Sequence, residues 1–321
     1  MSNQASPATT HHSPLITHHS PLTINGVAIE DTFAEAFPMT AARLIVTAAT
    51  AAWAETAAVE VTGYAASVIG CDAEAGIERM LPPEETPDGR PGVAILLYAF
   101  SRDSLQKAAI NRVGQCVLTC ATTACYNGLP LVPDKNIKIG GNLRFFGDGW
   151  QFSKKLEGRR FWRLPVMDGE FLCEDVFGTT KGVAGGNILI LGESQAAALA
   201  AAEAAVVAMR RVPGVILPFP GGIVRSGSKV GSRYKKLRAS TNDAYCPTLR
   251  GNVNTALPES VNAVYEIVID GLTLGAVEQA TRAGIRAACL PGVVRISAGN
   301  YGGNLGPFHI HLHKTLGQTS G

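Results

Sequence analysis

The segment from Leu217 to Thr248 carries the residues best suited by type and spacing to bind a negatively charged ligand. It lies between two strongly apolar segments, and its Pro residues and paired Gly residues favour a long ordered loop, which in a compact domain usually has a function. Its small polar donors are Ser226, Ser228, Ser240, Thr241 and Asn242. Its basic residues include Lys229, Arg233, Lys235, Lys236 and Arg238. Gly221 and Gly222 let the backbone approach a ligand closely, so we expect an anion to bind here, although a solvated surface loop has the same composition.

Two other kinds of chemistry fit this loop poorly. The string GIVRSGSK, residues 222–229, is similar to a phosphate-binding P-loop, but Ser228 stands between the glycine and the lysine, and Val230 occupies the magnesium-ligand position. Cys246 would need a histidine to activate it as a nucleophile, and no histidine occurs between residues 21 and 307. We therefore expect neither nucleotide hydrolysis nor thiol catalysis.

Glu266 is a candidate acid because of its neighbours. It is the only ionisable acid in the apolar run Val264–Ile269, and on a strand it shares a face with Val264 and Val268. Burial among these side chains would raise its pKa and keep it protonated near neutral pH, able to donate a hydrogen bond to an oxyanion. The same residues also fit an edge strand that turns Glu266 towards solvent.

Length, composition and charge restrict the class of protein. The chain has 321 residues, 46% hydrophobic and 17% charged, enough for one large or two ordinary globular domains. A net charge of +2 gives no indication of nucleic-acid binding, and no apolar run is long enough for a membrane span.

The seven cysteines lie mostly in apolar surroundings, which is typical of reduced thiols in the cytoplasm. Cys116, Cys120 and Cys125 lack CxxC spacing and a nearby histidine, so we expect no metal site.

The residues before position 135 predict an α+β lobe. The expected strands are residues 43–50, 67–71, 91–100 and 115–119, and the expected helices are residues 51–63 and 101–114. Ser101 is the expected N-cap of the second helix, and residues 29–37 are expected to form a short strand and then a loop with acidic residues. The order β-α-β-β-α-β is the split pattern of a ferredoxin-like sandwich.

The same order of elements returns in the second half of the chain. The expected strands are residues 185–194, 214–219, 264–271 and 292–299, and the expected helices are residues 194–212 and 273–289. Between the halves, residues 142–181 alternate short strands with Gly turns, which predicts β-hairpins. The predicted fold class is therefore α+β, with two ferredoxin-like lobes and inserted β-hairpins. The predicted divisions are an N-terminal lobe at 23–135, a hairpin linker or extension at 136–182 and a C-terminal lobe at 183–321.

All seven histidines lie near the chain ends. Four belong to a duplicated HHSPL element in residues 1–22, which we expect to be a disordered tail without the pattern of a signal peptide. His309, His311 and His313 alternate in the string FHIHLH, which predicts a strand with all three on one face. We expect that strand to be polar, facing solvent or an interface.

Ten strings, in order along nearly the whole chain from Ile24 to His313, resemble one enzyme family. They are EDTFAEAF (30–37), EAGIE (74–78), PPEETPDGRPG (82–92), VGQCVLT (113–119), FFGDG (145–149), PFPGGIV (218–224), SKVGS (228–232), ASTNDAYCPT (239–248), YEIVIDGL (265–272) and ISAGNYGGNLG (296–306). The family is formylmethanofuran:tetrahydromethanopterin formyltransferase. The near-neutral charge balance favours a bacterial member, such as the subunit of the formyltransferase/hydrolase complex.

This resemblance implies a homotetramer of two-lobed chains with active sites in clefts where subunits meet, and no bound metal or prosthetic group. It implies transfer of a formyl group between the amine of methanofuran and N5 of tetrahydromethanopterin, with both coenzymes as substrates. In bacteria it further implies hydrolase subunits as partners that release formate. Direct attack by the amine passes through a tetrahedral intermediate whose oxyanion needs a donor. The catalytic glutamate of the family falls on Glu266.

The types and positions of other residues suggest substrate-binding roles for this reaction. Residues expected to orient the pterin or the formyl oxygen are Ser240, Thr241, Asn242 and Asp243. Residues expected to hold substrate carboxylates are Gly221, Gly222, Ser228 and Lys229. Gly299 and Asn300 are expected to line the same cleft. Each of these residue types is also common in loops for purely architectural reasons.

A second class of function stays open on the sequence alone. Paired ferredoxin-like lobes also serve as non-catalytic modules that bind small molecules, and a scaffold subunit of a formyltransferase/hydrolase complex would keep the fold without the chemistry. The sequence contains no recognisable DNA-binding element or effector domain, which favours the enzyme.

Overall fold

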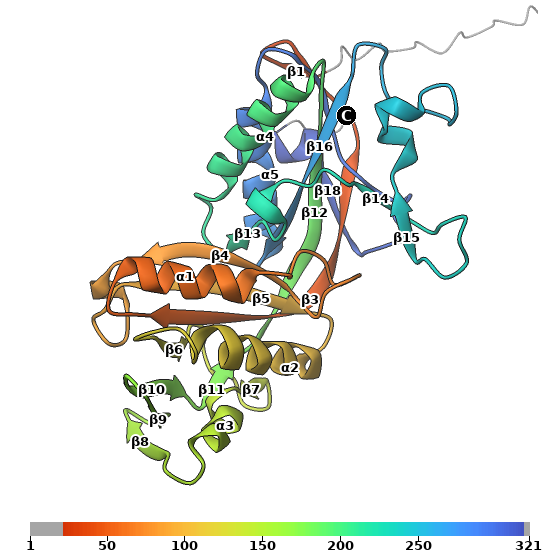
Figure 1. Cartoon of the computed structure of the whole chain (residues 1–321). Helices are drawn as coiled ribbons and strands as arrows, with labels where there is room; N and C mark the ends of the chain where they lie inside the picture. The colour runs from red at the N-terminus through yellow and green to blue at the C-terminus, as the bar shows by residue number, and fades with distance from the viewer. Residues whose placement is uncertain (1–21, 318–321) are drawn as a thin grey trace, which may run out of the picture.

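The computed structural model describes residues 22–317, which form two lobes joined by a continuous β-sheet (Figure 1). All but the last residue of the predicted tail at 1–22 lies outside this range. Within the described range, no helix is both long enough and apolar enough to cross a bilayer.

The first lobe is a four-stranded antiparallel sheet with two helices. Its elements are β3 (Phe33–Thr47), α1 (Ala51–Thr62), β4 (Glu74–Leu81), β5 (Gly92–Ala99), α2 (Arg102–Arg112) and β6 (Ala124–Asn127). The strands lie in the order β4-β5-β3-β6. Alternate side chains of β5 point to opposite faces: Ile95 and Leu97 pack in the core of this lobe, whereas Leu96 and Tyr98 pack against Ile216 of the second lobe. β5 is apolar along its length because both its faces are buried.

The second lobe repeats this arrangement. Its elements are β12 (Thr180–Gly192), α4 (Gln195–Met209), β13 (Val215–Ile216), β16 (Ala263–Gly271), α5 (Leu274–Ala288) and β17 (Val293–Ser297). The strands lie in the order β17-β12-β16-β13. Helices α4 and α5 pack closely, because α4 presents alanines and α5 has Gly284 at the contact, where a Cβ would lie 1.9 Å from Met209 Cε.

A long strand carries the sheet from one lobe to the other. The first residues of β12, Thr180–Ala184, pair with β3, and residues from Gly186 onwards pair with β16. The register shifts between Val183 and Gly186, and Gly185 adopts a φ of 85° that a residue with a side chain rarely reaches. This bulge bends the strand where the lobes meet.

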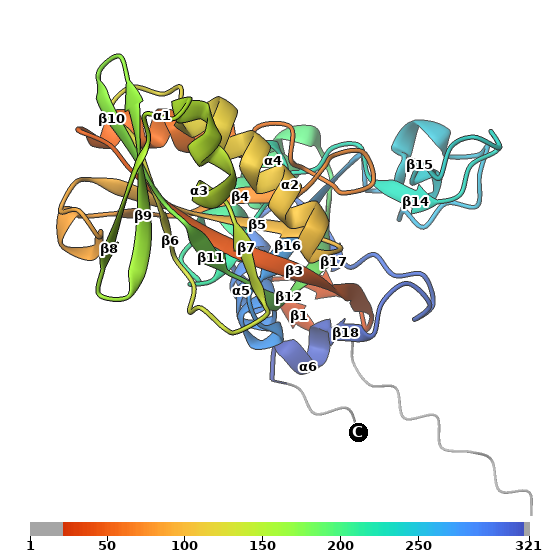
Figure 2. The same ribbon diagram turned by 90° about the horizontal axis from the view of Figure 1, so that it is seen from below.

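Hairpins project from both lobes (Figure 2). The remaining strands are β1 (Thr23–Ile24), β2 (Val27–Ile29), β7 (Asn136–Lys138), β8 (Phe152–Leu156), β9 (Arg159–Val166), β10 (Gly169–Glu174), β11 (Val176–Gly178), β14 (Ser228–Val230), β15 (Ala239–Thr241) and β18 (Phe308–His311), and the remaining α-helices are α3 (Gly140–Leu143) and α6 (Leu312–Thr315). The predicted turns LEGRR and MDGEF connect β8 to β9 and β9 to β10. The string FFGDGW instead contains a short 3-10 turn at Arg144–Gly147.

The four long helices begin at hydroxyl caps. Thr50, Ser101, Ser194 and Thr273 each accept a hydrogen bond from the backbone N–H three residues later. Such caps satisfy donors that the first helical turn leaves free. The predicted cap at Ser101 is confirmed.

Several local predictions are wrong, because a short apolar segment fits more than one kind of secondary structure. Residues 67–71 form a turn, and the strand starts later, at β4. Residues 115–119 are not a strand, because α2 continues as a π-helical turn at Val113–Val117 that buries both of its terminal valines. Residues 33–37 are not a loop but the start of β3, since the distant strand β18 pairs with them. His313 leaves the predicted strand for α6, where a ring nitrogen lies 2.9 Å from the Ile29 carbonyl oxygen.

Candidate active site

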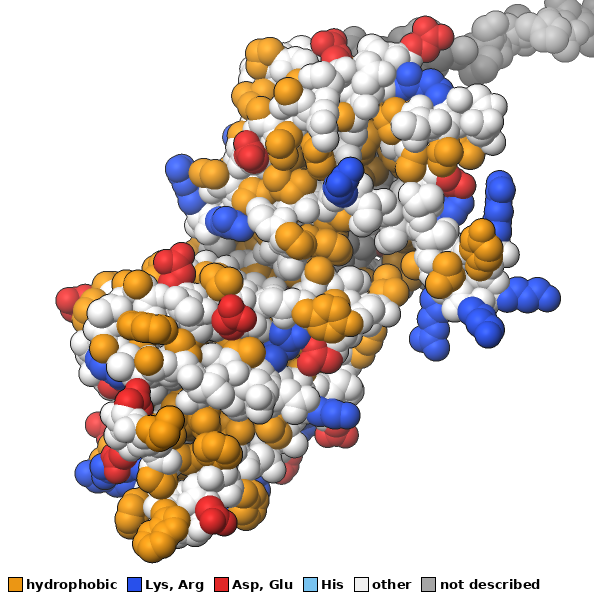
Figure 3. Space-filling view, viewed as in Figure 1, with side chains coloured by type: hydrophobic (Ala, Val, Ile, Leu, Met, Phe, Trp, Pro, Cys, Tyr) orange, Lys and Arg blue, Asp and Glu red, His pale blue; other side chains and the backbone are white. Residues whose placement is uncertain are grey.

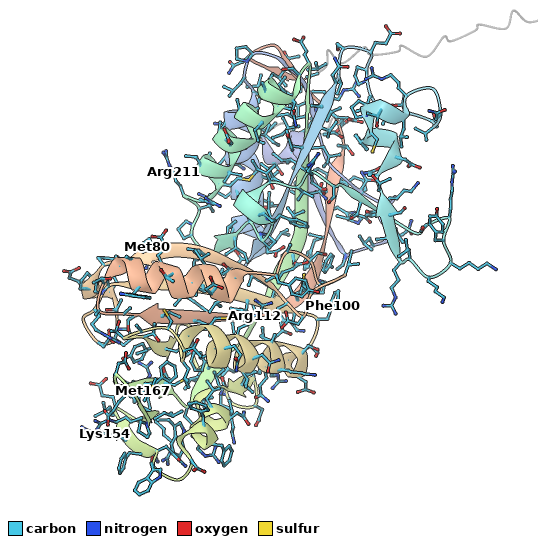
Figure 4. The ribbon with its side chains drawn as sticks, viewed as in Figure 1. Met80, Phe100, Arg112, Lys154, Met167 and Arg211 are labelled. Carbon is cyan, nitrogen blue, oxygen red and sulfur yellow. The ribbon has the colours of Figure 1, made fainter. Side chains whose placement is uncertain are left out.

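A cleft of about 750 Å³ lies where the two lobes meet the loop that carries β14 and β15. The first lobe and the start of β3 contribute Glu35, Phe37, Pro38, Ser67, Val68, Ile69, Gly70, Glu74 and Phe100. The second lobe contributes Gly185, Asn187, Phe219, Val224, Glu266, Val268, Tyr301 and Leu305. The loop contributes Ser226, Ser228, Lys229, Val230, Arg238 and Ala239. Phe100 lies at the junction of the lobes (Figure 4), with its ring centroid 5.9 Å from that of Phe37.

Glu266 lies inside the sheet and points into this cleft. On one side β16 pairs Glu266 with Leu189 of β12. On the other side, the Val224 N–H donates to the Glu266 carbonyl at 2.7 Å, and the Glu266 N–H donates to the Val224 carbonyl at 3.0 Å. Glu266 is therefore not on an edge strand, and that alternative does not hold.

The surroundings of the Glu266 carboxyl group favour its protonated form. The side chain shares its face of β16 with Val268, which also lines the cleft. Desolvation raises the pKa of Glu266 to about 7, and no group among residues 22–317 donates a hydrogen bond that would lower it. Near neutral pH a substantial fraction of this carboxyl group carries a proton in an apolar wall.

The loop at residues 299–305 closes another side of the cleft, and two buried polar side chains hold it. Glu35 accepts hydrogen bonds from the backbone N–H groups of Tyr301 and Leu305, the second at 3.0 Å. Asn187 of β12 accepts from the Gly299 N–H at 2.6 Å and donates to the Gly299 carbonyl at 3.2 Å. These bonds fix the loop relative to both β3 and β12.

Tyr301 connects this loop to the basic loop. Its hydroxyl donates to the Ser228 carbonyl at 3.0 Å. Burial, together with the nearby carboxyl groups of Glu266 and Glu35, raises the pKa of Tyr301. Tyr301 therefore keeps its proton and its hydrogen bond to the basic loop.

Positive charge gathers at the open side of the cleft. Lys229 lies on the wall and its Nζ is 2.6 Å from Asp243 Oδ2, an ion pair that lowers the pKa of Asp243. Arg238 also lines the cleft. Other Lys and Arg side chains spread into solvent from the same loop (Figure 3). An anionic ligand entering from this side would meet these charges first.

Three of the predicted site residues, Glu266, Ser228 and Lys229, lie together on the cleft wall. The others make architectural contacts. Gly221 and Gly222 form a tight turn with φ values of 66° and 87° just before Val224. Ser240, Thr241, Asn242 and Asp243 lie in and after β15, where Ser240 Oγ donates to the Gly231 carbonyl at 2.8 Å and the Asn242 N–H to the Gly227 carbonyl at 3.3 Å. Gly299 and Asn300 begin the loop over the cleft, and Asn300 Nδ2 donates to Thr32 and Phe33. Contact between these residues and a substrate stays a prediction.

Comparison with known protein families assigns both halves of the chain. Residues 22–166 match the family model described as formylmethanofuran-tetrahydromethanopterin formyltransferase, and residues 169–315 match the model described as its proximal lobe. The chain belongs to the formylmethanofuran-tetrahydromethanopterin formyltransferase family. The resemblance noted in the sequence is thereby confirmed.

Relatives of this formyltransferase family member align along nearly its whole length. The formyltransferase of Methylococcus capsulatus is 59% identical over 297 residues, which cover 91% of this chain and 99% of the relative. A component of the formyltransferase/hydrolase complex of Methylorubrum extorquens is 56% identical over 304 residues, 92% of this chain and 97% of the relative.

Solved structures of the formyltransferase family have the same fold. The formyltransferase from Methanosarcina barkeri matches with a TM-score of 0.88 at 51% identity, covering 92% of this chain and all of that one. A chain of the formyltransferase/hydrolase complex from Methylorubrum extorquens, solved with methylofuran, matches with a TM-score of 0.90 at 54% identity, covering 94% of this chain and all of that one.

Sequence reasoning missed several residues that shape the cleft of this formyltransferase family member, and two of them show why. Asn187 interrupts an apolar strand as Glu266 does, so the same signal could have identified it. Glu35 was expected only as a loop acid, because its partners lie 266 and 270 residues away in the chain. The residues next to Glu35 in the sequence do not indicate a contact with such distant residues.

Proposed function

We propose that this chain transfers a formyl group between N5 of tetrahydromethanopterin and the amine of methanofuran. Both coenzymes are substrates, and direct transfer requires no covalent enzyme intermediate. Relatives at 52–59% identity carry the name of this activity, which favours catalysis over a non-catalytic binding or scaffold role. The observation that carries the proposal is the position of Glu266 on the wall of the cleft between the lobes, where desolvation raises its pKa to about 7.

Glu266 acts as a hydrogen-bond donor in this mechanism. The acceptor amine attacks the formyl carbon, a new C–N bond forms, and the formyl oxygen becomes an oxyanion. The Glu266 carboxyl group donates to that oxygen, and its apolar surroundings strengthen the interaction. When the carbonyl forms again, the bond to the donor nitrogen breaks, and the proton lost by the acceptor amine passes to that nitrogen.

The rest of the cleft binds and orients the two coenzymes. Lys229 and Arg238 line the cleft, and in this proposal they bind anionic groups of the coenzymes. Phe37 and Phe100 offer an apolar wall for a ring system. Holding both substrates side by side converts a bimolecular reaction into an effectively unimolecular one, which supplies much of the rate.

We also propose the assembly that the resemblance implies, a homotetramer able to join hydrolase subunits. The segment at 145–152 supports it, since Phe145, Phe146, Trp150 and Phe152 are all exposed, and a group of exposed aromatic side chains often marks an interface. A relative occurs in a formyltransferase/hydrolase complex. Light scattering of the purified chain would test the tetramer, and co-purification from the native source would test the complex.

The ferredoxin-like class of the two lobes belongs to the same proposal. In both lobes the β-α-β-β-α-β order places the fourth strand beside the first and the third between the first and second. The divisions at 23–135, 136–182 and 183–321 follow from this repeat. Seven free cysteines support the predicted cytoplasmic location.

A formyl-exchange assay tests the activity directly. Purified protein is incubated with formylated donor and the free acceptor coenzyme, and the formylated acceptor is measured. We expect transfer by the chain alone, without hydrolase subunits. Binding of both coenzymes without transfer, with and without those subunits, would establish the non-catalytic alternative.

A further inference from the structure

Two buried carboxyl groups meet where the lobes join, and the mechanism above uses neither. Glu74 on β4 is 4% exposed and lines the cleft. Asp270 on β16 is 0% exposed and lies four residues after Glu266, on the same face of that strand. The charged and hydrogen-bonding neighbours of the pair include no lysine, arginine or histidine within residues 22–317.

Each of these carboxyl groups holds one wall of the cleft through one oxygen. The Val68 N–H donates to Glu74 Oε1 at 3.1 Å, in the wall segment 67–70 of the first lobe. The Gly185 N–H donates to Asp270 Oδ1 at 3.0 Å, at the bulge of β12. The two carboxyl groups therefore connect wall segments that belong to different lobes.

The two remaining oxygens need a shared proton. Glu74 Oε2 and Asp270 Oδ2 are fully buried, and no donor among residues 22–317 reaches either. The two carboxyl groups are close neighbours, since each shifts the pKa of the other. Two carboxylates have no proton to donate, so a hydrogen bond between these oxygens requires that one group of the pair is protonated. Paired aspartates in other proteins share a proton for the same reason.

The groups around the pair favour this protonated state. Tyr98 of β5 is buried nearby with a hydroxyl that has no partner in the described chain, and it brings no positive charge. Glu78 of β4 and Arg43 of β3 neutralise each other in an ion pair at 2.6 Å. Burial and the neighbouring carboxyl group raise the pKa of Asp270 well above its ordinary value, and burial raises the pKa of Glu74.

We propose that the proton shared by Glu74 and Asp270 clamps the two walls of the cleft together, and that both are positioning residues for coenzyme binding. The inference rests on the proposed function, because it concerns how this cleft binds its coenzymes. When the proton leaves, two negative charges face each other without water, and the walls at Val68 and Gly185 separate. Coenzyme affinity then falls, so KM rises with pH, whereas Glu266 controls kcat.

Asp270→Asn is the decisive variant. The amide Nδ2 donates to Glu74 Oε2 at every pH, while Oδ1 still accepts from Gly185. We expect the wild-type KM to rise about tenfold as the pH increases above neutral, and the KM of this variant to stay within about threefold of the wild-type value at pH 7. Asp270→Ala cannot bridge the walls, and its KM should be about tenfold higher already at pH 7. Asp134→Asn is the matched control, because it makes the same change at an exposed position; its KM should keep the wild-type dependence on pH.

Denaturant unfolding gives a readout that needs no catalysis. Protonation of the pair stabilises the fold, so stability falls as pH rises, and the wild-type unfolding midpoint should fall more steeply than that of Asp270→Asn. If the unfolding midpoint changes equally with pH in the two proteins, the pair does not share a proton. If the slopes differ but the KM values of the two proteins change with pH in the same way, the pair does not position the cleft for coenzyme binding. Absence of formyl transfer by the wild type would refute the proposed function, and the slopes would still decide on the proton.

Discussion

Replacing Glu266 with Gln tests the central step of the mechanism. The amide has the same shape as the carboxyl group but is a weaker hydrogen-bond donor and cannot exchange a proton with the intermediate. Loss of one such group typically lowers kcat by about 100-fold or more, which corresponds to about 2.7 kcal/mol of transition-state stabilisation. We expect kcat to fall by this factor, with KM little changed because the cleft keeps its shape.

The same substitution should stabilise the fold at neutral and alkaline pH. Burial raises the pKa of Glu266 from its ordinary 4.5 to about 7, so ionising it costs about 3 kcal/mol more in the folded protein than in the unfolded chain. Since the folded pKa is the higher one, this cost is absent below pH 4.5, grows as the pH rises to about 7 and is then constant. Gln carries no such cost, and the variant should gain up to about 3 kcal/mol of unfolding free energy above pH 7.

Two measurements over about pH 5 to 9 decide the matter: kcat for formyl transfer and the free energy of unfolding in denaturant. The wild-type kcat should decline as the pH rises through about 7, and the residual kcat of the variant should not. Glu203→Gln, the same change at an exposed position of α4, should behave as wild type in both measurements. Near-normal turnover by Glu266→Gln, or a wild-type kcat that does not change across this range, would remove Glu266 from the mechanism.

Three further substitutions test how the cleft is held. Glu35→Gln leaves one acceptor oxygen for two backbone N–H groups, so KM should rise about tenfold with kcat within about threefold, and an unchanged KM would contradict the role of the 299–305 loop. Asn187→Ala removes both hydrogen bonds to Gly299 and should lower the free energy of unfolding by about 1 to 3 kcal/mol in urea, unlike an exposed control such as Glu203→Ala. Lys229→Met breaks a solvent-screened ion pair and should leave the free energy of unfolding almost unchanged. Its KM should rise and depend less on salt, and a KM with wild-type salt dependence would exclude Lys229 from binding an anion.

The sequence alone determined features that depend on neighbouring residues. Hydroxyl caps mark the starts of the helices, and the periodicity of apolar residues gives the repeated order of strands and helices, because both signals act within a few residues. Glu266 could be recognised because an acid inside an apolar strand costs free energy wherever that strand is buried. The family resemblance then added the reaction.

Only the tertiary structure decided which distant residues share the cleft. Residues 33–37 form a strand rather than a loop because the distant strand β18 supplies backbone partners, and Glu35 gains its partners in the same way, from a residue 270 positions away. The proton shared by Glu74 and Asp270 likewise exists only because folding removes water from two carboxyl groups that lie on different lobes. Local propensity cannot report such contacts, since the burial and hydrogen bonding of each group depend on segments far away in the chain.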